Sequence, residues 1–277
     1  MALDKKVFFT RLGSAVVFTA IMLTCLLWNE WSFIALFLLV TILALKEFAF
    51  IVEKILNTTF SRNEKMNFYF IGVATFLAIT TLQINSGSNP VSLFLKPYLF
   101  YFVGLILGAV LMFFFFRKNK ESIFLLTGVS YISLSLGLLV QLRFQDMLLP
   151  ISLIVLIWTN DTMAYLTGSF IGKTPMAPSI SPKKTIEGTL GGIFFCMLFA
   201  GLWGYYSKTF SLPLWIIFGL IASLIGTIGD LVESKLKRMA DVKDSGMIMP
   251  GHGGALDRFD SLLLAAPFAY LVSLFFL

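Results

Sequence analysis

Long apolar runs separated by short charged segments dominate the pattern along the chain. About 20 apolar residues cross a bilayer as a helix, because a rise of about 1.5 Å per residue then covers roughly 30 Å of hydrocarbon. If each near-continuous run is one span, the pattern predicts about nine transmembrane helices. They cover residues 12–29, 31–52, 66–95, 97–116, 122–142, 147–172, 188–207, 209–229 and 261–277.

Charged residues interrupt only two of these runs internally. Lys46 and Glu47 break the second run, and Asp161 breaks the sixth. Backbone N–H and C=O groups have no water partner in lipid, so each span must satisfy them within its own helix. The predicted fold class is therefore an all-α polytopic integral membrane protein.

The positions of lysine and arginine predict the orientation of the chain. With the N-terminus placed in the cytoplasm, all 21 of these residues except Lys96, Arg143 and Lys208 fall in cytoplasmic segments. Cytoplasmic loops of membrane proteins are enriched in positive charge. We therefore expect a cytoplasmic N-terminus and a C-terminus on the opposite side, in the plasma (inner) membrane if the source is prokaryotic. The net charge of +6 is then a property of the loops, and no nucleic-acid partner is expected.

Composition excludes a soluble globular enzyme. The chain is 58% hydrophobic and 13% charged, whereas soluble domains are nearer half apolar and one quarter charged. Cys25 and Cys196 both lie inside apolar runs, so neither a disulfide framework nor a zinc site is indicated.

The polar features divide the chain into two regions. Residues 1–150 contain about five predicted spans and few distinctive polar motifs. Residues 151–277 contain the remaining spans and two unusual loops, 173–187 and 230–260, both on the cytoplasmic side of the predicted topology. We expect residues 151–277 to be the catalytic region.

Four carboxylates mark this second region. Asp161 lies within a span, Asp230 ends an apolar run, and Asp260 begins another, three residues after Asp257. Residues three apart share one face of a helix, and acids in or beside a membrane are candidates for function. Several aspartates also supply the oxygen ligands that Mg²⁺ prefers. The alternatives are solvated helix ends for Asp230 and Asp260, and a structural or proton-path role for Asp161.

Basic residues lie beside these acids, interleaved with glycine. Lysine and arginine neutralise phosphate oxygens, and glycines let backbone N–H groups approach them. The pattern favours a phosphate-binding site, although a basic patch beside a membrane can also bind anionic lipid headgroups. The only histidine, His252, lies between glycines; we interpret it as a phosphate contact, with a proton donor or a structural loop residue as alternatives. The basic residues concerned are Lys183, Lys184, Lys237, Arg238, Lys243 and Arg258.

The stretch 234–260 resembles the signature of the phosphatidate cytidylyltransferases, the CDP-diacylglycerol synthases. The resemblance rests on Lys237-Arg238, Lys243-Asp244, His252-Gly253-Gly254 and Asp257-Arg258-Phe259-Asp260, with their internal spacings. Segment 181–188 and the pair Asn160-Asp161 are also similar to segments of that family. By motif the resemblance covers roughly residues 158–260; the first 150 residues match only in hydropathy. Met249 and Ala255 stand where the family has other aliphatic residues, and both remain apolar.

This resemblance implies that CTP and phosphatidate react with Mg²⁺ to give CDP-diacylglycerol and pyrophosphate, at an active site facing the cytoplasm among membrane lipids. A second cation and a homodimer are open alternatives. The residues assigned to catalysis are Asp230, Asp257, Asp260 and Lys184. Those assigned to the metal are Asp230, Asp257, Asp260 and Asp244. Those assigned to substrate binding are Asp161, Lys173, Ser181, Lys183, Lys184, Lys237, Arg238, Lys243, His252 and Arg258.

Other functions remain open from the residues alone. An ion-coupled transporter would also place an aspartate within a span, and it predicts substrate flux without pyrophosphate release. A cytidylyltransferase acting on another membrane lipid phosphate would share the charged motifs, because a pocket for apolar chains has no distinctive pattern. A membrane scaffold would leave the combination of acidic and basic loops without a purpose.

Overall fold

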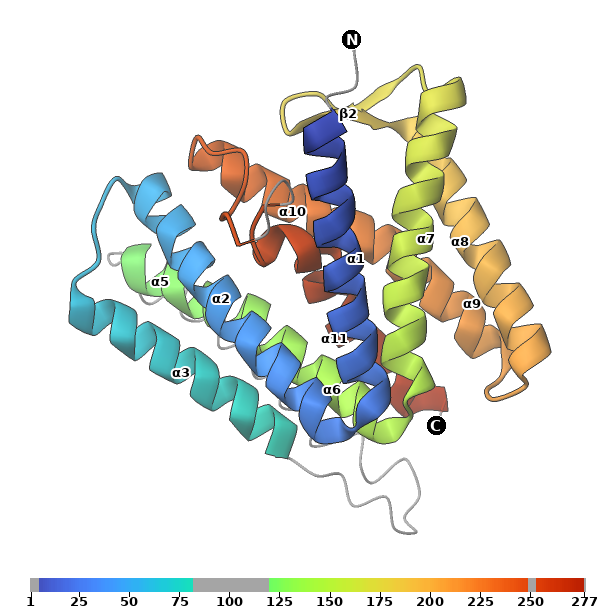
Figure 1. Cartoon of the computed structure of the whole chain (residues 1–277), viewed down its shortest axis with the longest axis horizontal. Coiled ribbons are helices and arrows are strands. Elements are labelled where there is room, and N and C mark those ends of the chain that lie inside the picture. The colour runs from blue at the N-terminus through green and yellow to red at the C-terminus, as the bar shows by residue number, and fades with distance from the viewer. Residues whose placement is uncertain (1–4, 82–119, 249–252, 277) are drawn as a thin grey trace.

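The computed structural model describes residues 5–81, 120–248 and 253–276, and these residues form a bundle of helices with one small β-hairpin (Figure 1). Two π-helical turns, η1 (Val129–Leu134) and η2 (Ile221–Ile225), join α5 to α6 and α9 to α10. The α-helices are α1 (Lys5–Trp28), α2 (Glu30–Leu56), α3 (Arg62–Thr81), α5 (Lys120–Gly128), α6 (Ser135–Gln145), α7 (Leu148–Ile171), α8 (Ile186–Ser207), α9 (Leu212–Leu220), α10 (Gly226–Met239) and α11 (Leu256–Phe276).

Within the described residues, six helices are long and apolar enough to cross a membrane. They are Glu30–Leu56, Ile123–Gln145, Leu148–Ile171, Ile186–Ser207, Leu212–Met239 and Leu256–Phe275. Each overlaps a predicted span, although Leu212–Met239 continues beyond the predicted end at residue 229 and Leu256–Phe275 begins before residue 261.

The other three predicted spans are not found as long apolar helices among the described residues. The run 12–29 falls in α1, where Val16–Trp28 is a shorter apolar helix. Helix α3 covers the first part of the run 66–95, and the rest of that run and the run 97–116 lie outside the described residues. The count of nine therefore stays a prediction.

The two ends of the bundle carry different segments of the chain. In Figure 1 the start of α1 and the hairpin strand β2 lie at one end of the bundle, and the end of α11 lies at the other. The C-terminal end of α10 lies on the same side of the bundle as the hairpin, since Arg238 Nε donates a hydrogen bond to the Ile180 carbonyl at 3.3 Å. The sides of the membrane that these ends face remain a prediction.

Side-chain caps fix where the helices begin. At the start of α2, the Ser32 amide donates to Asn29 Oδ1 at 2.8 Å and the Asn29 amide donates to Ser32 Oγ at 3.2 Å. At the start of α8, the Gly188 amide donates to Thr185 Oγ1 at 3.2 Å. Such caps satisfy N–H groups that have no partner within the helix, and they set the direction in which each helix leaves its loop.

The hairpin is the exception to the predicted all-α fold. Strands β1 (Pro175–Ala177) and β2 (Ser181–Thr185) pair antiparallel between α7 and α8. Proline lacks an N–H group and fixes its own φ, so Pro175 and Pro182 disfavour a continuous helix through this segment. The hairpin thus gives a fixed shape to a loop that carries Lys183 and Lys184.

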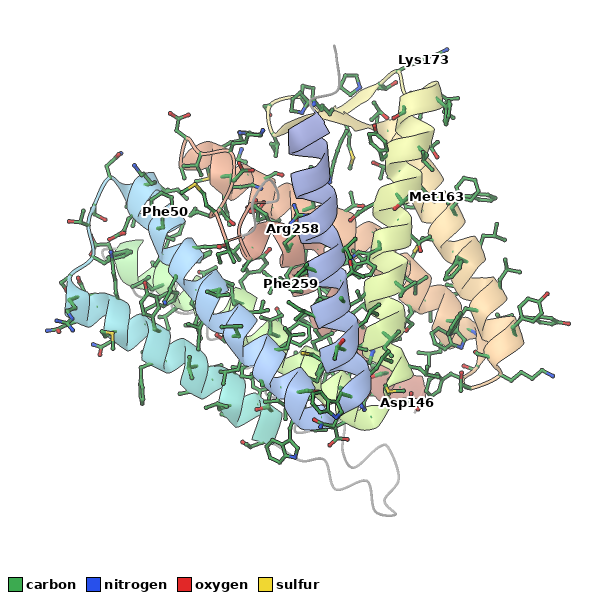
Figure 2. All side chains as sticks on the ribbon, viewed as in Figure 1. Phe50, Asp146, Met163, Lys173, Arg258 and Phe259 are labelled. Carbon is green, nitrogen blue, oxygen red and sulfur yellow. The ribbon has the colours of Figure 1, made fainter. Side chains whose placement is uncertain are left out.

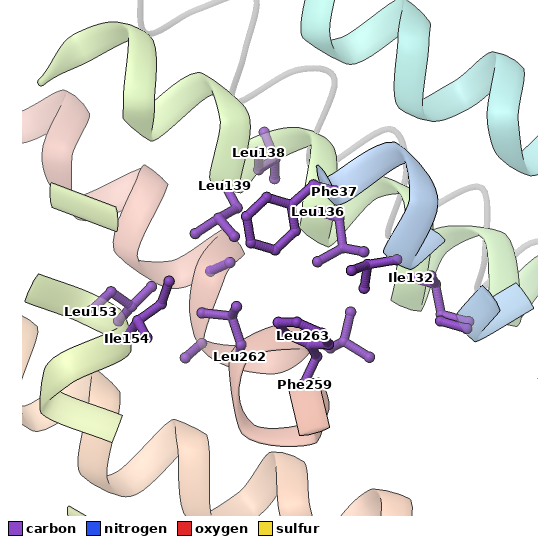
Figure 3. Close-up of a cluster of buried hydrophobic side chains, with 14 of the residues drawn as sticks. Phe37, Ile132, Leu136, Leu138, Leu139, Leu153, Ile154, Phe259, Leu262 and Leu263 are labelled. Carbon is purple, nitrogen blue, oxygen red and sulfur yellow. The ribbon is translucent and has the colours of Figure 1, made fainter. Parts of the chain in front are cut away.

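The packed core surrounds the first turns of α11. The Phe259 ring contacts Phe37 of α2 and Phe18 of α1, with ring centroids 5.8 Å and 5.9 Å apart. Figure 3 shows buried side chains from α2, η1, α6, α7 and α11 meeting in this region. The N-terminal half of the chain therefore helps to place the start of α11, where Asp257, Arg258 and Asp260 lie.

Candidate active site

A cavity of about 1140 Å³ lies where α1, α7, β2, α10 and the start of α11 meet. Phe18, Met22 and Trp158 give it an apolar part, and charged side chains line the rest. The cavity brings together residues from both loops that the sequence singled out. Those that line it are Asp161, Lys183, Lys184, Asp230, Lys237, Lys243, Asp244, Asp257, Arg258 and Asp260.

An ion pair joins Lys184 of β2 directly to Asp230 of α10. The prediction that 230–260 is a loop was wrong at both ends, because α10 continues to Met239 and α11 begins at Leu256. Lys184 of β2 is half-buried where it meets α10, whereas its neighbour Lys183 is exposed, and both residues line the cavity. Ser234, one turn after Asp230, donates its hydroxyl to the same carboxylate at 3.2 Å. The expectation that segments 173–187 and 230–260 meet at one site agrees with this contact.

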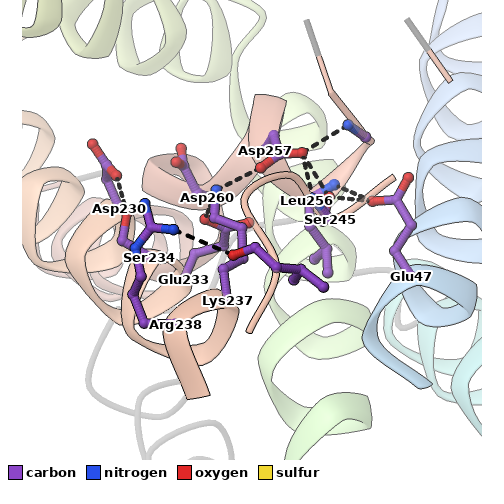
Figure 4. Close-up of polar contacts among 12 residues, drawn as sticks. Glu47, Asp230, Glu233, Ser234, Lys237, Arg238, Ser245, Leu256, Asp257 and Asp260 are labelled. Carbon is purple, nitrogen blue, oxygen red and sulfur yellow. Dashed lines mark hydrogen bonds and ion pairs between the residues drawn. The ribbon is translucent and has the colours of Figure 1, made fainter. Parts of the chain in front are cut away.

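A second ionic link runs from α10 to α11 through Lys237. Its ammonium group lies 2.5 Å from Glu233 and 2.5 Å from Asp257 (Figure 4). Glu233 is only 1% exposed, and a buried charge of this kind needs an opposite charge beside it. Lys237 is therefore shared between two carboxylates and fixes the spacing of α10 and α11.

Asp257 accepts hydrogen bonds on both of its carboxylate oxygens. Oδ1 contacts Lys237, and Oδ2 accepts from the Ser245 amide at 2.8 Å, the Ser245 hydroxyl at 2.9 Å and the Gly254 amide at 2.7 Å. Gly253 has φ of +80°, a conformation that residues with a Cβ rarely adopt. This glycine lets the backbone turn so that its neighbour's N–H reaches Asp257.

Three further carboxylates of the helices, those of Asp161, Asp230 and Asp260, line the same cavity, as does Asp244 of the loop before α11. Buried Asn160 donates to Asp161 Oδ1 at 3.4 Å and to Thr227 Oγ1 at 3.3 Å, and the second bond links α7 to α10. Within the described part of the chain, no three His, Cys, Asp or Glu side chains come together as a metal site. The carboxylates still fit Mg²⁺, which commonly takes one or two protein carboxylates and completes its shell with substrate phosphates and water.

Some residues assigned from the sequence do not line the cavity. Lys173 is exposed at the end of α7 and points away from the bundle (Figure 2). Ser181 pairs with Ala177 in the hairpin, and Arg238 donates to the backbone carbonyls of Ile180 and Val242. Their substrate roles stay predictions.

His252 lies outside the described residues, so its assigned phosphate contact is also still a prediction.

Two glutamates with extensive contacts were not assigned from the sequence. Glu187 accepts from the amides of Lys173 and Thr174 and from the Thr174 hydroxyl, and thereby ties the end of α7 to the start of α8. Glu47 lies in α2 and contacts the loop before α11. A charge inside an apolar span was the available signal for Glu47, but the sequence gives no indication of its partners.

Carboxylates and lysines around one cavity, among helices long and apolar enough to cross a membrane, suit an enzyme that acts on phosphate compounds at a membrane. The chain belongs to the cytidylyltransferase family, whose model matches residues 9–276. This match confirms the family relationship indicated by the motifs.

Relatives in several bacteria share part of the chain. A Staphylococcus aureus (strain COL) protein named phosphatidate cytidylyltransferase is 43% identical over 156 residues, which are 54% of this chain and 60% of that protein. Proteins of the same name from Bacillus subtilis (strain 168) and Staphylococcus saprophyticus are 48% identical over 126 residues and 39% over 156 residues. The matched segments cover 44% and 54% of this chain, and 46% and 60% of those two proteins.

Proposed function

We propose that the protein transfers CMP from CTP to phosphatidate, giving CDP-diacylglycerol and pyrophosphate for phospholipid synthesis. The observation that carries the proposal is the Lys184–Asp230 pair, which joins the basic hairpin to the carboxylates of α10 and α11 in one cavity. The relatives named phosphatidate cytidylyltransferase support the choice of substrates. The cavity is the place where this chemistry would occur.

The two kinds of surface in the cavity suit the two substrates. CTP is a water-soluble polyanion, and its triphosphate needs cationic side chains. Phosphatidate carries its phosphate at the headgroup plane and its acyl chains in the bilayer, so it needs an apolar surface beside a charged one. Phe18, Met22 and Trp158 supply the apolar surface next to the charged residues. In a bacterium, we expect this end of the bundle to face the cytoplasm at the plasma membrane.

The reaction requires no covalent enzyme intermediate. An oxygen of the lipid phosphate attacks the α-phosphorus of CTP in line, an O–P bond forms, and the bond from the α-phosphorus to pyrophosphate breaks. Because the lipid phosphate is already nucleophilic, the protein contributes mainly by positioning the substrates and neutralising charge. We assign the phosphates to four basic residues that line the cavity, namely Lys183, Lys184, Lys243 and Arg258.

Mg²⁺, when bound, would neutralise the phosphate oxygens and the leaving pyrophosphate. Asp230 and Asp260 are the residues that we assign to holding it, since both line the cavity from facing helices. Asp257 shares one oxygen with Lys237 and acts beside them, either on the metal or through that lysine. Asp244, at the cavity rim, is the weaker candidate, and Asp161 lines the cavity from α7.

The proposal is tested with purified protein in detergent, phosphatidate and CTP labelled in its cytosine ring. Label should enter the lipid extract only when protein, phosphatidate and Mg²⁺ are all present, and EDTA should abolish it. Replacing phosphatidate by an isoprenoid lipid phosphate tests the rival substrate. If folded protein labels that lipid and not phosphatidate, the proposed substrate is wrong; if it labels neither, the proposed activity is wrong.

A further inference from the structure

The Glu47 side chain connects the N-terminal half of the chain to the loop before α11. Glu47 lies in α2 and is 7% exposed. Its carboxylate accepts hydrogen bonds from the Ala255 amide at 2.8 Å, the Leu256 amide at 2.9 Å and the Ser245 hydroxyl at 2.8 Å (Figure 4). These partners are 198 to 209 residues away in the sequence, so no local signal relates them.

The loop is shaped to enclose this carboxylate. A Cβ built on Gly246 or Gly254 would collide with the Glu47 carboxylate oxygens. The absence of a Cβ at these two glycines therefore lets the backbone approach the Glu47 carboxylate closely. Removing a buried carboxylate from such a place leaves backbone N–H groups without an acceptor, which is unfavourable.

The Glu47 carboxylate, although it belongs to α2, also binds the backbone amides at the N-terminus of α11. The amides at a helix N-terminus carry partial positive charge and commonly bind anions, including phosphate. Here the anion is a side chain of the protein, because Glu47 accepts from Ala255 and Leu256. Because Glu47 already occupies these amides, we expect the substrate phosphates to bind the lysine and arginine side chains of the cavity instead.

Ser245 lies between Glu47 and Asp257 and contacts both carboxylates. Its hydroxyl oxygen lies 2.8 Å from Glu47 Oε2 and 2.9 Å from Asp257 Oδ2, so its single proton is shared between the two carboxylates, and its amide donates to the same Asp257 oxygen. A shift of Glu47 would therefore move both the loop and the carboxylate at the beginning of α11. Asp260 follows Asp257 by one helical turn and lines the cavity.

We infer that Glu47 is a positioning residue for cytidylyl transfer, which orients Asp257 and the first turn of α11 through Ser245 and the amides of Ala255 and Leu256. This inference rests on the proposed function. Glu47 contacts neither substrate nor metal in this role. Residues that orient metal-binding or catalytic groups typically change affinity or activity by about 10–100-fold when substituted.

The test uses Glu47→Gln, with Glu53→Gln as the matched control. Glu53 lies on the same helix and also accepts a backbone hydrogen bond, from Phe60 at 2.6 Å, but it pairs with Lys65 away from the cavity. In Glu47→Gln we expect turnover to fall about 10–100-fold or half-saturating Mg²⁺ to rise by that factor. Glu53→Gln should match the wild type in both. Equal Mg²⁺ dependence and equal turnover in all three proteins would overturn the inference.

A double-mutant cycle separates positioning from a general loss of stability. If Glu47 acts through Ser245, the effects of Glu47→Gln and Ser245→Ala on Mg²⁺ dependence should be strongly non-additive. Additive effects would mean that Glu47 acts by another route and would refute the proposed link. If Glu47→Gln does not yield folded protein, Ser245→Ala alone carries the same expectation, and a wild-type Mg²⁺ dependence in it would refute the link.

Hydrogen exchange gives a readout independent of activity. Glu47→Gln should speed amide exchange at Ala255 and Leu256 relative to wild type and Glu53→Gln, because their acceptor is weakened. Unchanged exchange would contradict the proposed contact. If exchange changes while the wild-type protein transfers no CMP, the proposed function fails and the contact remains; if the wild type is active and exchange is unchanged, the inference about Glu47 alone fails.

Discussion

The Lys184 ammonium group and the Asp230 carboxylate form an ion pair across 46 residues of sequence. The contact joins a β-hairpin to the charged end of a long helix, and both residues line the cavity proposed for CTP and phosphatidate. The pair also places a cation beside the carboxylates that we assign to Mg²⁺. Binding of a phosphate and a metal would then give each member of the pair a new partner of opposite charge.

Lys184→Ala should impair substrate capture more than metal binding. Loss of its charge removes a partner for phosphate oxygens, so the KM for CTP or phosphatidate should rise about tenfold or more. Steady-state kinetics at varied CTP, phosphatidate and Mg²⁺ would measure this. Lys46→Ala is the control, since Lys46 is exposed on α2 outside the cavity lining. Unchanged KM values for both substrates would remove Lys184 from the binding site.

Asp230→Asn and Asp260→Asn should each reduce turnover by about 100-fold or more, because an amide oxygen is a weaker ligand for Mg²⁺ than a carboxylate. Raising the Mg²⁺ concentration should restore part of the activity. Asp146→Asn is the control: Asp146 accepts from the Leu148 amide at the other end of α7, and asparagine can also cap a helix. Normal turnover and Mg²⁺ dependence in both site variants would exclude them as metal ligands.

Gly253→Ala should destabilise the loop before α11. At φ of +80° an added Cβ is strained, with a cost of about 1–2 kcal/mol, and it would also collide with the Asp257 carboxylate. We expect a lower thermal unfolding midpoint in detergent and reduced activity. Gly201→Ala, in an open position on α8, should unfold at or above the wild-type temperature. Equal unfolding temperatures for Gly253→Ala and wild type would contradict the conformation described for this loop.

The topology can be tested by labelling single cysteines in a background from which Cys25 and Cys196 have been removed. Cysteines at exposed Ser179 and Asp241 should react with an impermeant reagent from the same side of a sealed vesicle. A cysteine at Lys208, between α8 and α9, should react from the opposite side. Labelling of Ser179 and Asp241 positions from opposite sides would mean that the two loops cannot share a cavity.

The helical spans could be predicted because lipid leaves the backbone few alternatives. Apolar runs were sufficient to locate the six long apolar helices of the described residues, although the end of α10 was predicted as part of a loop. The hairpin was harder to foresee, since short strands depend on pairing with each other and Pro175 and Pro182 indicate only that a helix is disfavoured.

Partners of individual charges could not be predicted. The sequence indicated a phosphate-binding role for Lys237, which stays a prediction, but gave no sign that its ammonium group contacts both Glu233 and Asp257. Glu47 read as an interruption in an apolar run, because its acceptor role depends on a loop that is distant in sequence. Contacts of this kind arise from the packing of helices that are distant in the sequence, so the pattern of a single sequence cannot predict them.

The position of a phosphorus label in CTP tests the proposed transfer most directly. The purified protein, with phosphatidate and Mg²⁺, is supplied with CTP labelled either at the α-phosphate or at the γ-phosphate. We expect α-label in the lipid extract and γ-label in water-soluble pyrophosphate, in equal amounts. Lipid that acquires the γ-label, or folded protein that releases no pyrophosphate and transfers neither label, would contradict the proposed function.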